Sequence, residues 1–150
     1  MKFNKKIAIV LLVLISLTAQ KVLSQNIIDT ELLIGTWVFD YDKSILEMDE
    51  QIKSRFDKIE IKTLIEKAYK GRKISFMKDG LCLIETPNET KTNIKWSLKK
   101  DNIIEFLNEK GSKKTYLIST LNSNKLLLIN KKLINKKRNS LFSKNYITKI

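Results

Sequence analysis

The 150-residue chain is strongly basic, with 29 Lys and Arg against 16 Asp and Glu and a formal net charge of +13 at pH 7. Hydrophobic residues make up 43% of the chain, which fits a small globular domain and excludes a disordered or collagen-like one. The chain contains no histidine, which excludes Ser-His-Asp and Cys-His catalysis and every metal site that needs an imidazole ligand.

Residues 1–24 have the pattern of a secretory signal peptide. The first six residues carry three lysines, an apolar run follows, and Ser24 is a small residue before a cut at Gln25. The apolar run is shorter than the roughly 20 residues of a membrane-spanning helix. Gln25 is also not the cysteine that lipid attachment needs. The sequence therefore predicts an exported protein, periplasmic or extracellular and not lipid-anchored, with one mature domain over residues 25–150.

Alternating aromatic residues predict the first strand, over residues 35–42. Trp37, Phe39 and Tyr41 fall on one face of such a strand, because successive side chains point to opposite faces. The strand therefore presents an aromatic face to a core.

A helical insertion is predicted over residues 44–70. Apolar residues recur there at helical spacing, and two capping boxes, Ser44 to Glu47 and Thr63 to Glu66, mark helix starts. We expect two helices with a break near residues 58–62, because one helix of this length spans about 40 Å, longer than a domain this small. A single helix satisfies the same spacing and stays open as the alternative.

After the insertion, apolar residues recur at every second position. This period predicts seven more strands, near residues 72–78, 81–86, 92–98, 102–107, 113–120, 124–130 and 141–149. Asp79-Gly80 is the strongest hairpin signal between them. The predicted fold is mainly β: an eight-stranded antiparallel up-and-down barrel, whose closure removes the unpaired sheet edges.

Short motifs in this pattern resemble a known family. Gly35-Thr36-Trp37 resembles the Gly-x-Trp signature that opens lipocalins and their small exported bacterial relatives, and the run 95–104 is similar to their tryptophan-bearing strand and hairpin. The resemblance implies a lipocalin-like barrel with Gly35 and Trp37 at its base, and a late basic side chain, Lys144 or Lys149, over the tryptophan ring. The helical insertion looks more like the lid of fatty-acid-binding proteins.

Aromatic residues on the expected inner faces give a candidate ligand site. These residues are Phe39, Phe76, Trp96, Phe106 and Tyr116. They predict a barrel that binds one small hydrophobic or amphipathic ligand. An eight-stranded barrel is also narrow enough to be filled by its own side chains. The alternative is therefore a filled barrel that acts as a non-enzymatic cell-envelope module, through its helical face or its basic C-terminal surface.

No motif in the chain supplies catalytic chemistry. Glycine-rich phosphate-binding loops, a Gly-x-Ser-x-Gly turn and a Cys-x-x-Cys pair are all missing from the sequence. Asp40 and Asp42 share one face of the first predicted strand, but a solvated strand edge explains them better than a carboxylate site. Cys82 is the only cysteine and is expected to be buried. We predict a protein that is not an enzyme, with no catalytic residues, metal ligands or cofactor.

The densest basic cluster lies near the C-terminus. It consists of Lys131, Lys132, Lys136, Lys137 and Arg138. Export argues against nucleic acid as the partner of this cluster. The candidate partner is an anionic membrane or envelope surface, held weakly through lysines, and a solvated loop is the simpler interpretation. The sequence indicates no oligomeric state.

Overall fold

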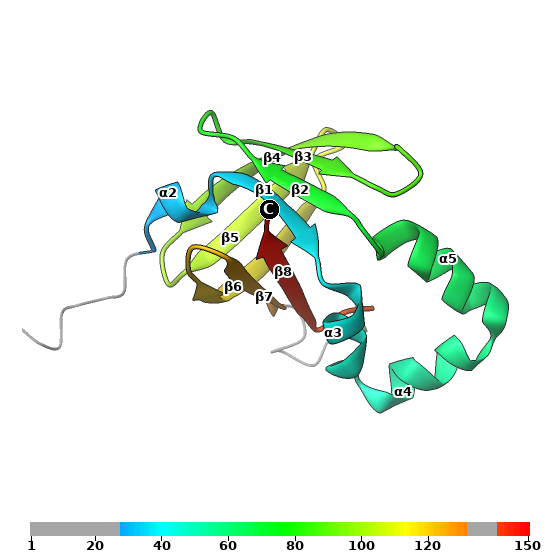
Figure 1. The fold of residues 1–150 in the computed structure, drawn as a ribbon. Helices are drawn as coiled ribbons and strands as arrows, with labels where there is room; N and C mark the ends of the chain where they lie inside the picture. The colour runs from blue at the N-terminus through cyan, green and yellow to red at the C-terminus, as the bar shows by residue number, and fades with distance from the viewer. Residues whose placement is uncertain (1–27, 132–140) are drawn as a thin grey trace, which may run out of the picture.

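Eight antiparallel strands pair in sequence order, and the last returns to pair with the first (Figure 1). The structure is a computed structural model, and it describes residues 28–131 and 141–150. The strands are β1 (Gly35–Phe39), β2 (Lys73–Phe76), β3 (Leu81–Glu85), β4 (Lys91–Lys99), β5 (Ile103–Asn108), β6 (Lys113–Leu121), β7 (Lys125–Asn130) and β8 (Lys144–Lys149). The predicted up-and-down barrel is confirmed, and its topology is consistent with a lipocalin-like fold.

The inner face of the barrel is built from the period-two pattern of the sequence. Ile74 lies opposite Ile84, and Cys82 lies opposite Ile94, in register across neighbouring strands. Cys82 is fully buried, and burial raises the pKa of its thiol to about 12. The thiol is therefore protonated at neutral pH and packs as a small apolar side chain.

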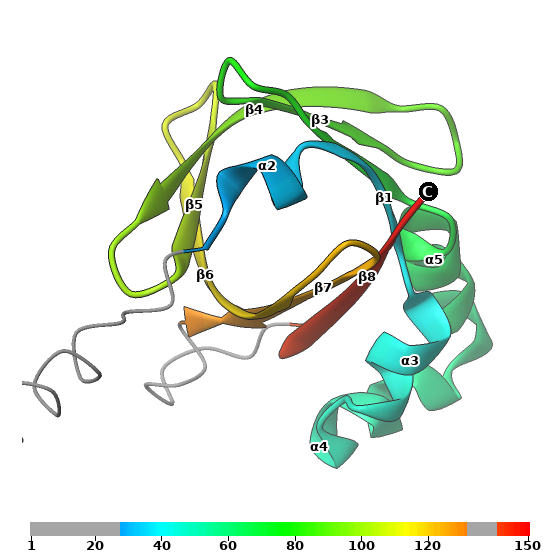
Figure 2. The same cartoon turned by 60° about the vertical axis from the view of Figure 1, so that its left-hand side comes forward.

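One end of the barrel is covered by the short helix α2 (Thr30–Leu33), which lies across the opening in Figure 2. Leu33 and Trp37 are both fully buried, and the Trp37 Nε1–H donates a hydrogen bond of 2.8 Å to the Leu33 carbonyl. The hairpins β2–β3, β4–β5 and β6–β7 turn at this same end, because they connect strands that run antiparallel. The helical connection between β1 and β2 therefore lies at the opposite end.

The first strand is shorter than predicted. It ends at Phe39, and the helix α3 (Tyr41–Leu46) begins where strand was expected. The Asp40 carboxylate accepts a hydrogen bond of 3.0 Å from the Lys43 N–H, so Asp40 acts as an N-cap. Asp40 and Asp42 are therefore not a carboxylate pair on a strand.

The helical insertion consists of several short helices, and the single-helix alternative is wrong. After α3 come α4 (Glu50–Lys53), the 3-10 helix η1 (Ser54–Asp57) and α5 (Ile59–Tyr69). The helical conformation is interrupted at Asp49, which caps α4, and again at Lys58, which has an extended conformation. The second break falls at the edge of the predicted interval 58–62.

Neither predicted capping box forms. Ser44 lies inside α3, and its hydroxyl accepts a hydrogen bond of 3.1 Å from the Tyr146 N–H of β8. Thr63 lies inside α5 and donates to the Ile59 carbonyl. Capping competes with other hydrogen-bond partners, and here a strand and a preceding helical turn supply them.

Helix α3 is fixed to the start of β8, which begins at Lys144 rather than at residue 141. The Asp40 N–H donates to the Tyr146 carbonyl at 2.8 Å, and the Lys144 amine pairs with the Glu47 carboxylate at 2.8 Å. The hydrogen bond from Lys144 lowers the pKa of Glu47.

The helices in the described part of the chain are too short or too polar to span a lipid bilayer.

Candidate functional site

A cavity of about 300 Å³ lies inside the barrel, at the end opposite α2. Its walls come from the C-terminal end of β1, the start of β2 and the ends of the strands that reach the same rim. The apolar part of the wall consists of Phe39, Ile74, Ile84, Ile94, Phe106, Leu128 and Ile147. Because all these side chains occupy inward register positions, the fold itself produces the apolar interior.

The predicted aromatic residues divide into two groups. Phe39, Phe106 and Tyr116 line the cavity, whereas Phe76 and Trp96 do not. Phe76 is 2% exposed and packs edge-on against Trp96, with ring centroids 5.5 Å apart. These two rings lie deeper in the barrel, towards α2, and fill it.

Trp96 is held in place by the β2–β3 hairpin. Its Nε1–H lies 3.0 Å from the Leu81 carbonyl and 3.2 Å from the Met77 carbonyl. Phe76 also contacts Phe106 at a centroid distance of 6.0 Å. Phe106 therefore forms the floor of the cavity, and Phe76 and Trp96 fill the barrel beneath it.

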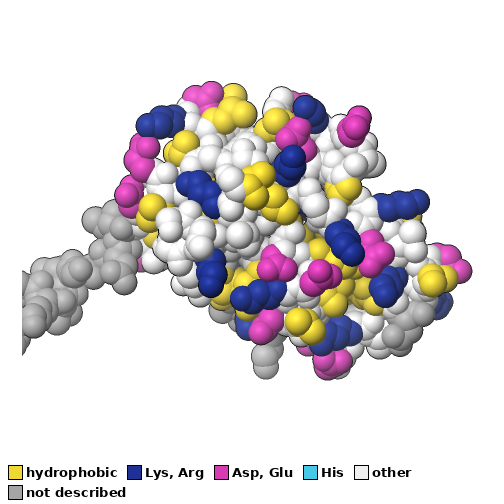
Figure 3. All heavy atoms as spheres, viewed as in Figure 1, with side chains coloured by type: hydrophobic (Ala, Val, Ile, Leu, Met, Phe, Trp, Pro, Cys, Tyr) yellow, Lys and Arg dark blue, Asp and Glu magenta, His cyan; other side chains and the backbone are white. Residues whose placement is uncertain are grey.

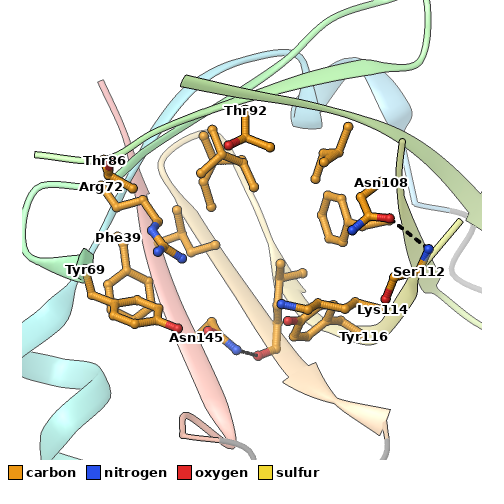
Figure 4. Close-up of a pocket in the computed structure, with 16 residues that line it drawn as sticks. Phe39, Tyr69, Arg72, Thr86, Thr92, Asn108, Ser112, Lys114, Tyr116 and Asn145 are labelled. Carbon is orange, nitrogen blue, oxygen red and sulfur yellow. Dashed lines mark hydrogen bonds between the residues drawn. The ribbon is translucent and has the colours of Figure 1, made fainter. Parts of the chain in front are cut away.

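The rim of the cavity is polar and positively charged. Tyr69, Arg72, Lys114, Tyr116 and Asn145 line both this cavity and an adjoining hollow of about 320 Å³. Figure 4 shows the Arg72 guanidinium and the Lys114 amine reaching towards the cavity from opposite walls. Among the residues that the structure describes, no aspartate or glutamate lines either space.

Two tyrosines and an asparagine complete the rim. Tyr116 is half-buried, and burial is the main reason why its pKa is raised above the ordinary value. The Asn145 side-chain amide donates to the Leu128 carbonyl at 3.3 Å, which fixes its orientation. Tyr69 packs against Phe39, with ring centroids 5.6 Å apart, so α5 is anchored to the barrel at the rim.

The charged and amide residues of the rim were missed in the sequence analysis, although a signal was present. Arg72 continues the inward alternation of Ile74 and Phe76, and Lys114 that of Tyr116 and Ile118. A lysine or arginine at an inward position is unusual, since burying an unpaired charge is unfavourable. Such a residue is therefore expected at the open rim, and there Lys114 is exposed and Arg72 half-buried. Extending each inward face by one residue towards the rim would have identified both cations.

At the other end of the barrel, the predicted base is present. Lys149 Nζ lies 5.1 Å from the centroid of the Trp37 ring and donates a hydrogen bond of 3.0 Å to the Leu32 carbonyl. Lys149 is therefore the late basic residue that the resemblance implies. Lys144 is paired with Glu47 instead.

The basic cluster is described only at its first residue. Lys131 is exposed and follows β7 at the same end of the barrel as the cavity. Lys132, Lys136, Lys137 and Arg138 lie outside the described residues, as does the predicted signal peptide, residues 1–24. Among residues 28–131 and 141–150, no group of three or more Cys, Asp and Glu side chains could hold a metal ion.

No protein-family model, no curated protein and no solved structure matches this chain. The geometry alone therefore defines the class of protein. It is a closed, eight-stranded antiparallel β-barrel with an apolar cavity at one end and a cationic rim around that cavity.

Proposed function

We propose that this is an exported, non-enzymatic, lipocalin-like protein that binds one small hydrophobic or amphipathic ligand in its barrel. The observation that carries the proposal is the cavity of about 300 Å³ with an apolar wall. This volume is at the lower end of the range for ligand pockets. At about 30 Å³ for each water-sized group, it accommodates on the order of ten heavy atoms. Export is proposed from the sequence of residues 1–24.

The matched pair Ile84→Glu and Leu83→Glu tests this function. The two residues are neighbours on β3, but only Ile84 lines the cavity. We expect the mature chain to bind the small neutral fluorophore 1-naphthylamine with a Kd of about 1 µM, or about −8 kcal/mol. Ile84→Glu should abolish that binding. A carboxylate in the apolar wall must stay hydrated, and an apolar ligand in the cavity would remove its water. Leu83→Glu should bind as the parent does.

Fluorescence titration measures both variants, and circular dichroism establishes that each is folded. Saturable binding that is lost in Ile84→Glu alone supports the proposal. No saturable binding by the folded parent, or equal binding by both variants, contradicts it.

The helical face carries the second candidate function. Leu46 is 75% exposed, Ile59 73% and Leu64 67%, all in the segment between β1 and β2. Figure 3 shows hydrophobic side chains at the surface of this region, among interspersed lysines and acidic residues. Large exposed apolar side chains are typical of interaction surfaces. A fluorophore that still binds after Ile84→Glu would favour this envelope-interaction module over the ligand-binding barrel.

A further inference from the structure

We propose that the ligand carries an anionic headgroup, a carboxylate or a phosphate, which Arg72 and Lys114 bind at the rim of the cavity. This inference rests on the proposed function, because it assigns the polar end of a ligand whose apolar chain occupies the barrel. The chemical class is a single-chain anionic amphiphile of about ten carbons, the size that a cavity of about 300 Å³ accommodates.

Arg72 is oriented by contacts that, within residues 28–131 and 141–150, use only one of its guanidinium donors. Its Nε–H donates to the Ala68 carbonyl at 3.1 Å, and its guanidinium carbon lies 4.0 Å from the centroid of the Tyr69 ring. An arginine has five N–H donors in a planar fork that matches two oxygens of a carboxylate or phosphate. One donor is used by the end of α5, and the fork is held in position at the rim.

Lys114 enters from the opposite wall (Figure 4). In register it lies opposite Phe106, on the inward face of β6. Its neighbour Lys113 occupies the outward face and pairs with Glu105 at 3.5 Å. Within the described residues, neither Arg72 nor Lys114 has such a carboxylate partner.

Charge balance then favours an anion over a neutral or cationic group. Two cations face a cavity that none of the described acidic residues lines. Cations beside a partly enclosed apolar space are stabilised by an anion that binds between them, and a charge-assisted hydrogen bond is stronger than a neutral one. The hydroxyls of Tyr69 and Tyr116 lie at this same rim and supply two further donors.

The structure supplies a matched control for both cations. Lys73 follows Arg72, and Lys113 precedes Lys114, and both control lysines are exposed and absent from the cavity lining. The double variants R72Q/K114Q and K73Q/K113Q therefore remove the same net charge from opposite faces of the same segments. Only the first removes it from the cavity rim.

The test measures the affinity of the mature chain for four probes with a ten-carbon chain, by displacement of 1-naphthylamine below the micelle concentration of each probe. The probes are decanoate, decyl phosphate, decanol and decyltrimethylammonium. We expect decanoate or decyl phosphate to bind about tenfold or more tightly than decanol, and the trimethylammonium probe to bind most weakly. The tighter of the two anions identifies the headgroup.

R72Q/K114Q should lose about tenfold or more in affinity for the preferred anion and keep its affinity for decanol, whereas K73Q/K113Q should keep both. If the R72Q/K114Q variant fails to fold, the single variant K114Q at the exposed rim should show the same selective loss. Decanol that binds as tightly as both anions, or equal losses in the two double variants, would overturn the anionic headgroup and leave the proposed function intact. Failure of all four probes to bind the folded parent contradicts the proposed function itself.

Discussion

Replacing Trp37 with alanine will lower the free energy of unfolding by about 3–5 kcal/mol. Trp37 is 0% exposed, so its removal leaves a large cavity at the base of the barrel. It also removes the donor to the Leu33 carbonyl and the ring beneath Lys149 Nζ. Because a typical domain is stable by only 5–15 kcal/mol, the loss is a large part of the total.

Urea denaturation monitored by circular dichroism measures the effect. Leu64→Ala is the control, since Leu64 is 67% exposed on α5 and its truncation should change the free energy of unfolding by less than about 0.5 kcal/mol. A Trp37→Ala variant as stable as Leu64→Ala would mean that the barrel is not closed by α2 over Trp37.

Gly35→Ala should lower the free energy of unfolding by about 3 kcal/mol. Gly35 opens β1 with φ of +123°, a conformation that L-residues rarely adopt. A Cβ there would also lie 2.9 Å from Lys149 Cε, so the lysine would have to move from its position over Trp37. Backbone strain at Gly35 and the loss of the contact between Lys149 and the Trp37 ring both lower the free energy of unfolding.

Gly111→Ala separates the general effect of a positive φ from the specific one. Gly111 has φ of +75° in the β5–β6 turn, and a Cβ there meets no atom within 4 Å. Its substitution should lower the free energy of unfolding by about 1 kcal/mol. Equal losses at the two glycines, measured by the same denaturation, would show that the contact with Lys149 does not contribute.

Strand number, order and topology could be predicted from the sequence because the inward residues of a barrel alternate with outward ones. The pairing of Ile74 with Ile84, and of Trp96 with Phe106, follows from that alternation and from short hairpins. What the alternation could not show is how far into the barrel each aromatic ring lies. Phe76 and Trp96 were predicted to line the ligand site, yet they fill the barrel beneath it.

The helical boundaries could not be predicted because the side chains that decide them have more than one possible hydrogen-bond partner. Ser44 has the spacing of a capping residue, but its hydroxyl bonds to Tyr146, 102 residues away. Asp40 satisfies the alternation of a strand, but its carboxylate caps α3. In both cases a tertiary hydrogen bond or a local cap overrides the periodicity.

The rim shows a different limit of sequence analysis. Arg72 and Lys114 are two of 29 basic residues, so neither is distinguished by its type. The inward alternation marks each of them separately, but only closure of the barrel shows that these residues, 42 positions apart, line one cavity. Topology therefore contributes the charge of the site, whereas alternation contributes its apolar wall.

The central claim is that a ligand binds inside the barrel, and methyl NMR of the mature chain titrated with decanol tests it most directly. We expect the methyl resonances of Ile84, Ile94 and Ile147, which line the cavity, to shift together and saturate with one binding constant. The methyl resonances of Leu46 and Leu64, both exposed on the helical segment, should not shift. Shifts confined to the helical segment, or no saturable shift at the three isoleucines, would contradict the account.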